Sequence, residues 1–309
     1  MDLPDGLAAA RDGVVAVERP DLAALTLGGA DVLRYLHAVS SQHTADLRPG
    51  DAAEALLLSP KGRIEFAFRL AVLDGGVLVD ADAEVAPALA ERLERFVFRH
   101  DVTVGAPKPG AASLLGPASD DALSRAGLPA PGPGRVAAAS PALVVHRSAA
   151  GADVVGAAAP AALRALRAAG VPAGPPELWE LVRVQRGLPR AGRELTDDVL
   201  AEEAGLLGSH VHLDKGCYPG QETVARVHNL GQVQRRLAGL RLQGEDGDLP
   251  AFRAELVGDD GRRVGQVRSA VRHPELGAIA LAYVHRSVEP GRLLLVGGRP
   301  AQVVQLPFA

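Results

Sequence analysis

The last third of the chain alternates short apolar runs with turn residues, and this pattern restricts the fold more than any other feature. The runs are rich in Leu, Val and Ala, and Gly, Asp and Pro separate them. They cover residues 237–242, 253–257, 263–271, 278–283, 293–296 and 301–304. Short strands at this spacing indicate a small antiparallel barrel. We therefore predict a β-barrel domain over residues 233–309.

The preceding part of the chain shows one order of elements twice: strand, helix, strand, strand, helix. In the first copy, strands are predicted at 14–18, 22–27, 54–58, 64–72 and 77–80, with helices at 31–40 and 84–97. In the second copy, strands are predicted at 113–115, 142–146 and 153–155, with helices at 120–126 and 159–169. The fold class is therefore α+β, with sheet-and-helix domains at 1–108 and 109–232. A Pro/Gly linker then leads into a helix at 176–187.

Composition narrows the functional classes. The formal net charge of −4, from 33 basic and 37 acidic residues, is too mild for a nucleic-acid-binding protein. The first residues lack the basic and apolar regions of a secretory signal, and no apolar run approaches the ~20 residues that span a bilayer. A single cysteine excludes an internal disulfide and fits a reducing compartment. We expect a cytoplasmic protein with no nucleic-acid or membrane partner.

That single cysteine, Cys217, lies in a stretch that resembles neither a core strand nor an amphipathic helix. Residues 214–226 read D-K-G-C-Y-P-G-Q-E-T-V-A-R. Tyr218-Pro219-Gly220-Gln221 has Pro and Gly at the two central positions of a type II turn. We predict a shaped loop that surrounds the thiol with polar groups. The alternative is a buried structural cysteine, but so many polar side chains near Cys217 in the sequence do not suit a hydrophobic core.

The chemistry open to one cysteine is limited. An iron–sulfur cluster takes about four thiolate ligands from its protein, so this chain cannot hold a conventional cluster alone. His210 and His212 lie near Cys217, but their spacing matches no familiar zinc motif, and an H-V-H alternation is also typical of a strand. We therefore expect no stably bound metal.

The stretch K-G-C-Y-P-G-Q-E, followed by V-A-R at 224–226, resembles the signature of the folate-binding YgfZ-type proteins. These are relatives of the glycine-cleavage aminomethyltransferase (T-protein) that are implicated in iron–sulfur cluster assembly and repair. Further pieces occur in the expected order: S-P-K-G-R-I at 59–64, R-G-L-P at 186–189 and A-E-E-A-G-L at 201–206. The resemblance implies two α+β domains and a C-terminal barrel around a central folate cavity.

The resemblance also implies roles for individual residues. Cys217 would be the working residue, and Lys215 would stabilise its thiolate, because residues i and i+2 of an extended segment point the same way. The local excess of Lys and Arg suits tetrahydrofolate, whose glutamate is anionic. The residues of the motif assigned to folate binding are Tyr218, Gln221, Glu222 and Arg226.

Two positions depart from the aminomethyltransferase pattern. Those enzymes carry an acidic pair where this chain has R-I-E-F, with Glu65 as the only acid. They also carry a glutamate that binds the pterin ring where this chain has Gln185, and an amide offers one acceptor where a carboxylate offers two. We assign Glu65 and Gln185 to the folate site, but these changes argue against glycine cleavage.

Three hypotheses follow. The first is a tetrahydrofolate-binding accessory protein for iron–sulfur enzymes or cluster carrier proteins that works through Cys217. The second is a folate-dependent aminomethyl transferase, with Glu65 orienting the folate. The third is a non-enzymatic thiol sensor or interaction protein. The incomplete acidic pair favours the first hypothesis over the second. The full motif around the thiol favours the first hypothesis over the third, and whether a reaction is catalysed stays open.

Overall fold

The computed structural model describes residues 1–132, 135–140, 143–231, 233–244 and 248–308. Its contacts divide the chain into two compact units. The first consists of Met1–Leu58, Phe66–Trp179 and Ser209–Pro219, and the second of Ser59–Glu65, Glu180–Gly208 and Gly220–Ala309. Each unit is therefore built from segments that lie far apart in the sequence. The predicted α+β class with a C-terminal barrel is confirmed.

The first sheet has the strand order β3-β4-β5-β2-β6, with β7 paired to β2. The strands are β2 (Leu22–Gly28), β3 (Ala52–Leu58), β4 (Ile64–Leu73), β5 (Gly76–Asp82), β6 (Thr103–Val104) and β7 (Lys108–Pro109). Helices α2 (Val32–Val39) and α3 (Ala86–Arg95) pack on one face. Helix α2 buries Val32, Tyr35 and Leu36, the i, i+3, i+4 spacing of an apolar stripe.

The second sheet has the order β12-β1-β8-β11-β10-β9. Its strands are β1 (Val15–Glu18), β8 (Ala111–Leu115), β9 (Val136–Ser140), β10 (Leu143–Ser148), β11 (Gly151–Val155) and β12 (Ala173–Gly174), and helices α4 (Ser119–Arg125) and α5 (Ala159–Ala168) pack against it. Strand β1 pairs with β8 and β12, although the sequence pattern places it in the same layer as β2. Residue 142, the predicted start of β10, lies outside the described residues.

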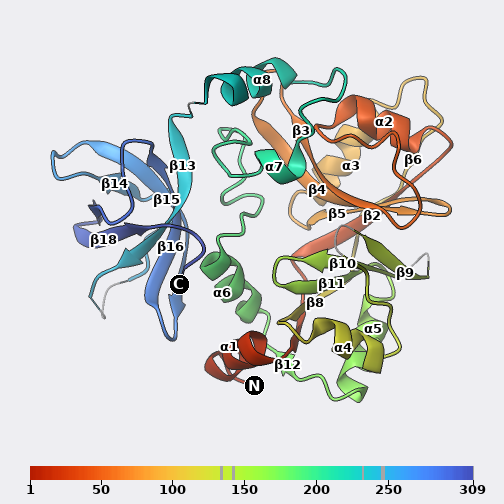
Figure 1. Ribbon diagram of the computed structural model, residues 1–309, viewed down its shortest axis with the longest axis horizontal. Coiled ribbons are helices and arrows are strands. Elements are labelled where there is room, and N and C mark those ends of the chain that lie inside the picture. The colour runs from red at the N-terminus through yellow and green to blue at the C-terminus, as the bar shows by residue number, and fades with distance from the viewer. Residues whose placement is uncertain (133–134, 141–142, 232, 245–247, 309) are drawn as a thin grey trace. The chain divides into compact units, whose positions relative to one another are not determined.

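The two sheets pack against each other within the first unit. Figure 1 shows α2 and α3 on one side of this pair of sheets and α4 and α5 on the other. The apolar contact between the sheets is small and consists of Ala24, Ala71, Leu78, Val136, Val144 and Val155. Small side chains let the sheets approach closely, and they leave room beside them for a polar network.

This network joins four strands through charged side chains. Arg69 on β4 donates to Asp80 Oδ2 on β5 at 2.6 and 2.8 Å, and to Asp153 Oδ2 on β11 at 2.5 Å. His146 Nε2 on β10 lies 3.1 Å from Asp80 Oδ1. Burial alone would raise the pKa of Asp80, but Arg69 and His146 outweigh it and lower that pKa strongly. The two sheets are therefore linked by buried ion pairs.

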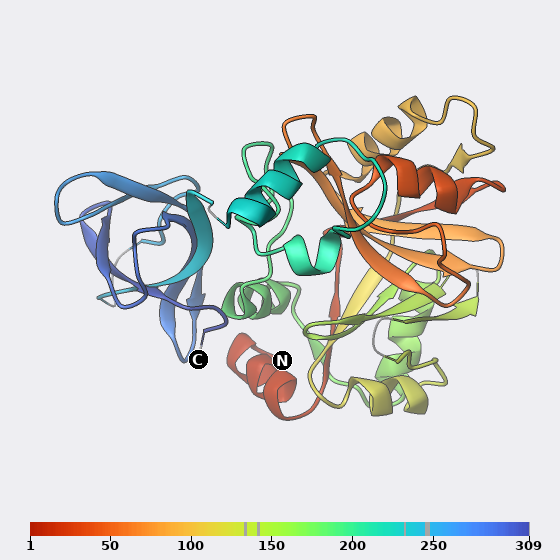
Figure 2. The same ribbon diagram turned by 45° about the horizontal axis from the view of Figure 1, so that its top comes forward.

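The second unit contains the closed barrel β13-β16-β15-β14-β17-β18, drawn in blue in Figure 2. Its strands are β13 (Arg235–Leu242), β14 (Glu255–Val257), β15 (Arg263–His273), β16 (Gly277–His285), β17 (Leu293–Val296) and β18 (Arg299–Val304). These six strands match the six predicted apolar runs, so the predicted barrel is confirmed. The physical reason is local: Gly and Pro turns close every connection.

Helix α6 (Glu177–Arg186) and the segment after it are fastened to the barrel inside the second unit. Arg183, buried on α6, donates to Glu194 Oε2 at 3.2 Å and to Ser269 Oγ on β15 at 2.7 Å. The Tyr283 hydroxyl on β16 donates to the Glu194 carbonyl at 3.1 Å. Polar contacts thus order the long 187–206 segment, which has little regular structure.

The sequence pattern missed helix α1 (Leu3–Asp12). Its start was nevertheless encoded, because the Asp2 carboxylate accepts from the Asp5 amide at 2.9 Å and Pro4 stands in the first turn. Among the described residues, none of the helices has the length and apolar character needed to cross a bilayer.

Candidate functional site

The cysteine loop, defined here as residues 209–219, lies in the first unit and rests on the polar run that follows helix α2. The His212 amide donates to the Ser41 carbonyl at 2.9 Å, and the Ser41 hydroxyl donates to the His210 carbonyl at 2.6 Å. Gln42 Nε2 donates to the Ser209 carbonyl at 3.1 Å. The stretch begins in the last two residues of α7 (Leu207–His210), and Figure 2 shows the chain after that helix as an arc without regular structure that leads to α8 (Gln221–Leu230).

Lys215 anchors the middle of the loop. Its ammonium donates to the Ser40 carbonyl at 2.6 Å and to the His37 carbonyl. Both carbonyls belong to the C-terminal end of α2, where acceptors lack intrahelical donors and a cation is favoured. Burial lowers the pKa of Lys215 to about 8, while the two carbonyl acceptors favour the charged form and oppose that shift. Lys215 therefore acts as a C-terminal cap for α2.

Lys215 and Cys217 differ in their exposure to solvent. The lysine is 8% exposed and packs its ammonium 4.7 Å from the centre of the Tyr218 ring, which is also buried. Cys217 is exposed. The backbone turns at residues 213–214 and bends at Lys215 instead of running as an extended strand, so the i, i+2 argument for a shared direction does not apply here. The loop presents its thiol outward and keeps its cation inside.

Lys215→Met is expected to destabilise the first unit by about 1–3 kcal/mol, because two carbonyls at the end of α2 lose their donor. The native protein should also gain stability with rising pH. The pKa of Lys215 is about 8 when folded and about 10.4 when unfolded. Between these values the unfolded state binds more protons, so stability rises with pH and the variant lacks this rise.

Urea unfolding followed by fluorescence of Trp179, the only tryptophan, measures this pH dependence in the first unit. The difference between wild type and variant should grow by at most about 3 kcal/mol between pH 8 and 10.4. A constant difference across this window would contradict a buried lysine with a lowered pKa.

A cavity of about 520 Å³ opens in the first unit. Its wall includes Gln42 and Ser209, which also form one of the hydrogen bonds that hold the cysteine loop. This volume is in the range of small-molecule sites. Three arginines and one glutamate contribute charge to its wall, which consists of Gln42, His43, Leu47, Ala52, Ala53, Glu54, Arg69, Arg135, His146, Arg147 and Ser209. The N–H groups of these arginines are possible donors to a ligand that carries carboxylates.

The cavity arginines are held in place by carboxylates. Arg147 pairs with Asp120 through both terminal nitrogens at 2.7 Å, and Arg135 pairs with Asp51. A guanidinium has five N–H donors, so one paired carboxylate leaves donors for a ligand. The remaining donors of the cavity therefore fit an anionic ligand.

The second half of the signature lies in the second unit and is helical, where the sequence predicted a loop through residue 226. Gly220 adopts φ 81° and ψ 0°, which are the values of the third residue of a type II turn, as predicted. Helix α8 then begins at Gln221. Glu222 and Arg226 are exposed on it, and Gln221 is half-buried.

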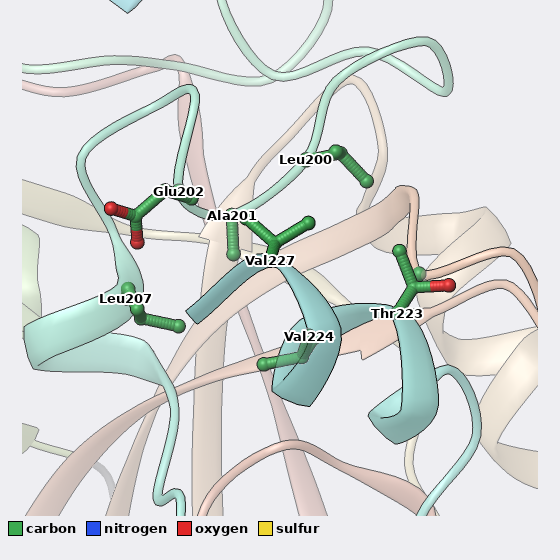
Figure 3. A pocket seen from close by; sticks show the side chains of 8 residues that line it. Leu200, Ala201, Glu202, Leu207, Thr223, Val224 and Val227 are labelled. Carbon is green, nitrogen blue, oxygen red and sulfur yellow. The ribbon is translucent and has the colours of Figure 1, made fainter. Parts of the chain in front are cut away.

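Three segments of the family pattern meet at helix α8 within the second unit: residues 59–64, residues 201–206 and the second half of the signature, residues 220–226. A Cβ atom at Gly62 would lie 2.7 Å from Thr223 Cβ, and one at Gly220 would lie 2.5 Å from the Ser59 carbonyl oxygen. Figure 3 shows side chains of α8 and of the 200–207 segment around a small hollow: Leu200, Ala201, Glu202, Leu207, Thr223, Val224 and Val227. The hollow is too small for a ligand such as a pterin, so these motif residues serve packing.

The remaining predicted site residues also lie in the second unit. Glu65 is half-buried near the start of β4, and Gln185 is half-buried near the end of α6. The Gln185 carbonyl accepts from the Phe308 amide at 2.9 Å. The predicted residues are thus divided: Cys217, Lys215 and Tyr218 belong to the first unit, and Glu65, Gln185, Gln221, Glu222 and Arg226 to the second.

The sequence pattern did not identify the residues that hold the cysteine loop in place. Ser41, Gln42 and His43 hold the loop or line the cavity, and none was singled out. Their signal was the polar run S-S-Q-H-T at 40–44, which directly follows an apolar helix. Its importance depends on a contact with residues about 170 positions away.

His210, one of the two histidines near the thiol in the sequence, contacts a carboxylate. His210 Nδ1 lies 3.5 Å from Glu54 Oε2, and burial lowers the pKa of His210 although Glu54 opposes this shift. Within the described part of the chain, no group of three or more His, Cys, Asp or Glu side chains has the arrangement of a metal site.

Known proteins share both parts of this architecture. Residues 235–309 match the family model for the glycine cleavage T-protein C-terminal barrel domain. The glycine cleavage aminomethyltransferase of Bartonella henselae has the same fold, with a TM-score of 0.87 and 20% identity over 99% of this chain and 89% of that chain.

Sequence relatives extend the similarity. A chloroplastic protein of Arabidopsis thaliana is 24% identical over 86% of this chain and 63% of its own length. An aminomethyltransferase of Nostoc is 36% identical over 42% of this chain and 35% of its own length. The tRNA-modifying protein YgfZ of Aliivibrio fischeri is 27% identical over 42% of each. This chain thus spans less than two thirds of each of these relatives. Residues 235–309 thus carry the T-protein type of C-terminal barrel, and the chain as a whole resembles the aminomethyltransferases in fold and, over part of its length, the aminomethyltransferases and YgfZ proteins in sequence.

Proposed function

We propose that this protein binds a reduced folate and assists the assembly or repair of iron–sulfur clusters, with Cys217 as its working residue. The observation that carries the proposal is the arginine-lined cavity whose wall includes Gln42, His43 and Ser209. Gln42 also bonds to Ser209 at the start of the cysteine loop. Gln42 therefore lines the cavity and also helps to hold the loop that carries the exposed thiol.

A reduced folate matches the cavity in size and charge. Its glutamate carboxylates are natural partners for the remaining N–H donors of Arg135 and Arg147, because a hydrogen bond from a guanidinium to a carboxylate is charge-assisted. Its flat ring suits the apolar part of the wall, Leu47, Ala52 and Ala53. The aminomethyltransferase relatives support a folate-related function.

The outward position of Cys217 favours work on another protein. An exposed thiol on an anchored loop is accessible to a large partner, whereas a buried one is not. A single cysteine supplies too few ligands for a cluster, so the client, an iron–sulfur enzyme or a cluster carrier protein, would hold the others. A free thiol of this kind fits the reducing cytoplasm.

Titration calorimetry with tetrahydrofolate tests the ligand. We expect binding that weakens as salt rises, and Arg135→Gln should weaken it about tenfold by removing one charged contact. The matched control is Arg164→Gln, an exposed arginine on α5 outside the cavity wall, which should bind like wild type. Absence of binding at millimolar ligand would remove folate from the function.

A second candidate is an aminomethyl transferase, which the 36% identity to the Nostoc enzyme favours. The incomplete acidic pair at Glu65 opposes it. Formation of methylenetetrahydrofolate from an aminomethylated carrier at enzyme-like rates, about 1–10³ s⁻¹, together with its loss in Glu65→Ala, would make this candidate correct.

A further inference from the structure

Arginine and aromatic side chains alternate in one part of the second unit. The guanidinium carbons of Arg193 and Arg253 lie 5.4 and 5.3 Å from the ring centre of Phe252, and that of Arg268 lies 5.9 Å from the same centre. The guanidinium carbons of Arg268 and Arg235 lie 5.2 and 5.0 Å from the ring centre of Tyr283. All of these residues belong to the second unit. We call the group the arginine ladder: Arg193, Arg253, Phe252, Arg268, Tyr283 and Arg235.

The inner end of the arginine ladder is neutralised by carboxylates. Arg268 is buried, and both Arg268 and Arg235 lie 3.1 Å from Asp198 Oδ2. Arg235 also pairs with Glu203 at 3.1 Å. These ion pairs fasten strands β13 and β15 of the barrel to the 187–206 segment.

The outer end of the arginine ladder lacks such carboxylates. Arg193 and Arg253 are both exposed, and among the described residues neither guanidinium has an ion pair or a hydrogen bond. Glu255, two positions after Arg253, is paired with Arg263 at 3.1 Å. A contact between a cation and an exposed aromatic ring contributes only about 0.5–1 kcal/mol. The N–H donors of both guanidiniums are therefore available to an anion.

The backbone beside the outer end is irregular at two adjoining places. Arg253 has a φ of 65°, which is uncommon for a residue other than glycine. Its amide donates to the Val267 carbonyl at 2.8 Å, and the Val267 amide donates to the Ala254 carbonyl at 2.9 Å. The pairing of β15 with β16 shifts directly after Val267, so Arg268 is the extra residue of a β-bulge. Backbone strain that neighbours hold in place is typical of functional positions, and here it accompanies two arginines on the same ring.

We propose that the outer end of the arginine ladder docks an acidic segment of a partner protein. Two guanidiniums on one ring provide charge-assisted hydrogen bonds for two carboxylates. Phe252 is 38% exposed and offers a contact for an apolar side chain of the same segment. Aromatic residues and arginine are enriched in protein interfaces and carry much of their binding energy. The inference rests on the second unit alone and depends on neither folate nor Cys217.

A single-stranded nucleic acid would offer phosphates and bases to the same groups. The chain has a formal net charge of −4, which opposes the long-range attraction on which nucleic-acid binding depends. A short acidic segment needs only the local pair of guanidiniums. The charge of the chain therefore favours a protein segment as the occupant.

Fluorescence anisotropy with the labelled peptide Gly-Glu-Glu-Leu-Glu-Glu-Gly tests the docking point, and the same peptide with Gln for every Glu is the comparison. Wild type should bind the acidic peptide at least about tenfold more tightly, and this difference should shrink as salt rises. Arg193→Gln and Arg253→Asn should each weaken its binding about tenfold, and asparagine tolerates the positive φ at position 253. The matched control is Arg292→Gln, an exposed barrel arginine paired with Asp259, which should bind like wild type.

Thermal unfolding of each variant checks that its fold is kept. Arg193 and Arg253 belong to different segments, so the loss of one variant through misfolding leaves the other as the test. Equal binding of the two peptides by wild type, or unchanged binding of the acidic peptide in both arginine variants, would overturn the docking point. Tighter binding of a single-stranded oligothymidylate than of the acidic peptide, lost in the same variants, would overturn the protein segment and assign the site to nucleic acid.

Discussion

Arg69→Met is expected to destabilise the first unit by about 3–5 kcal/mol, because it leaves the carboxylates of Asp80 and Asp153 buried without their cation. Asp80 is 1% exposed and Asp153 is 2% exposed, so water cannot replace the lost guanidinium. Arg69 also connects the two sheets through charge. Urea unfolding followed by Trp179 fluorescence measures the loss in the first unit.

The matched control is Arg167→Met, since Arg167 pairs with Glu18 at 3.1 Å with both side chains about half exposed. This surface pair should contribute no more than about 1 kcal/mol. Equal losses in the two variants would contradict the role of the buried network.

The buried ion pairs of Arg69 also predict that the stability of the first unit falls at acid pH. The pKa of Asp80 is lowered in the folded chain, so its pairing stabilises the protein above its unfolded pKa, about 3.9. That stability is lost as the pH falls below this value toward the folded pKa. Part of the loss on acidification should be absent from Arg69→Met, because the main cause of the lowered pKa is gone.

Cys217→Ser is expected to abolish the protein's ability to restore iron–sulfur enzyme activity in cells that lack it, while the fold stays intact. The side chain is exposed, and surface substitutions usually change stability by less than about 0.5 kcal/mol. Serine keeps the size of the residue but supplies no thiolate to bind iron or attack a partner. Folate affinity should stay close to that of wild type.

Lys215→Ala gives the comparison for Cys217→Ser. It should reduce function only in part, because it loosens the loop at α2 but keeps the sulfur. Its thiol should react at a different rate with an alkylating reagent, since the loop is no longer anchored. Full restoration of enzyme activity by Cys217→Ser would show that the sulfur is dispensable and would defeat the proposed function.

The sequence by itself determined the elements whose causes are local. The six barrel strands follow from apolar runs between Gly and Pro turns. Helix α6 begins directly after Pro176. The turn at Gly220 follows from a glycine at the position that needs a positive φ. Each of these depends on neighbours within a few residues, so the pattern is readable without a structure.

Only the tertiary structure decided the arrangement of the site. Strand β1 pairs with the second sheet, because β8 and β12, rather than β2, supply its hydrogen bonds. Lys215 faces inward because the end of α2, residues 37–40, offers two carbonyls that need a donor. The ring of His43 lies between those of His37 and His212, which is part of the cysteine loop. The Lys215 contacts join residues 175 and 178 positions apart, and β1 pairs with the distant strand β8. No local pattern records which distant groups will satisfy one another.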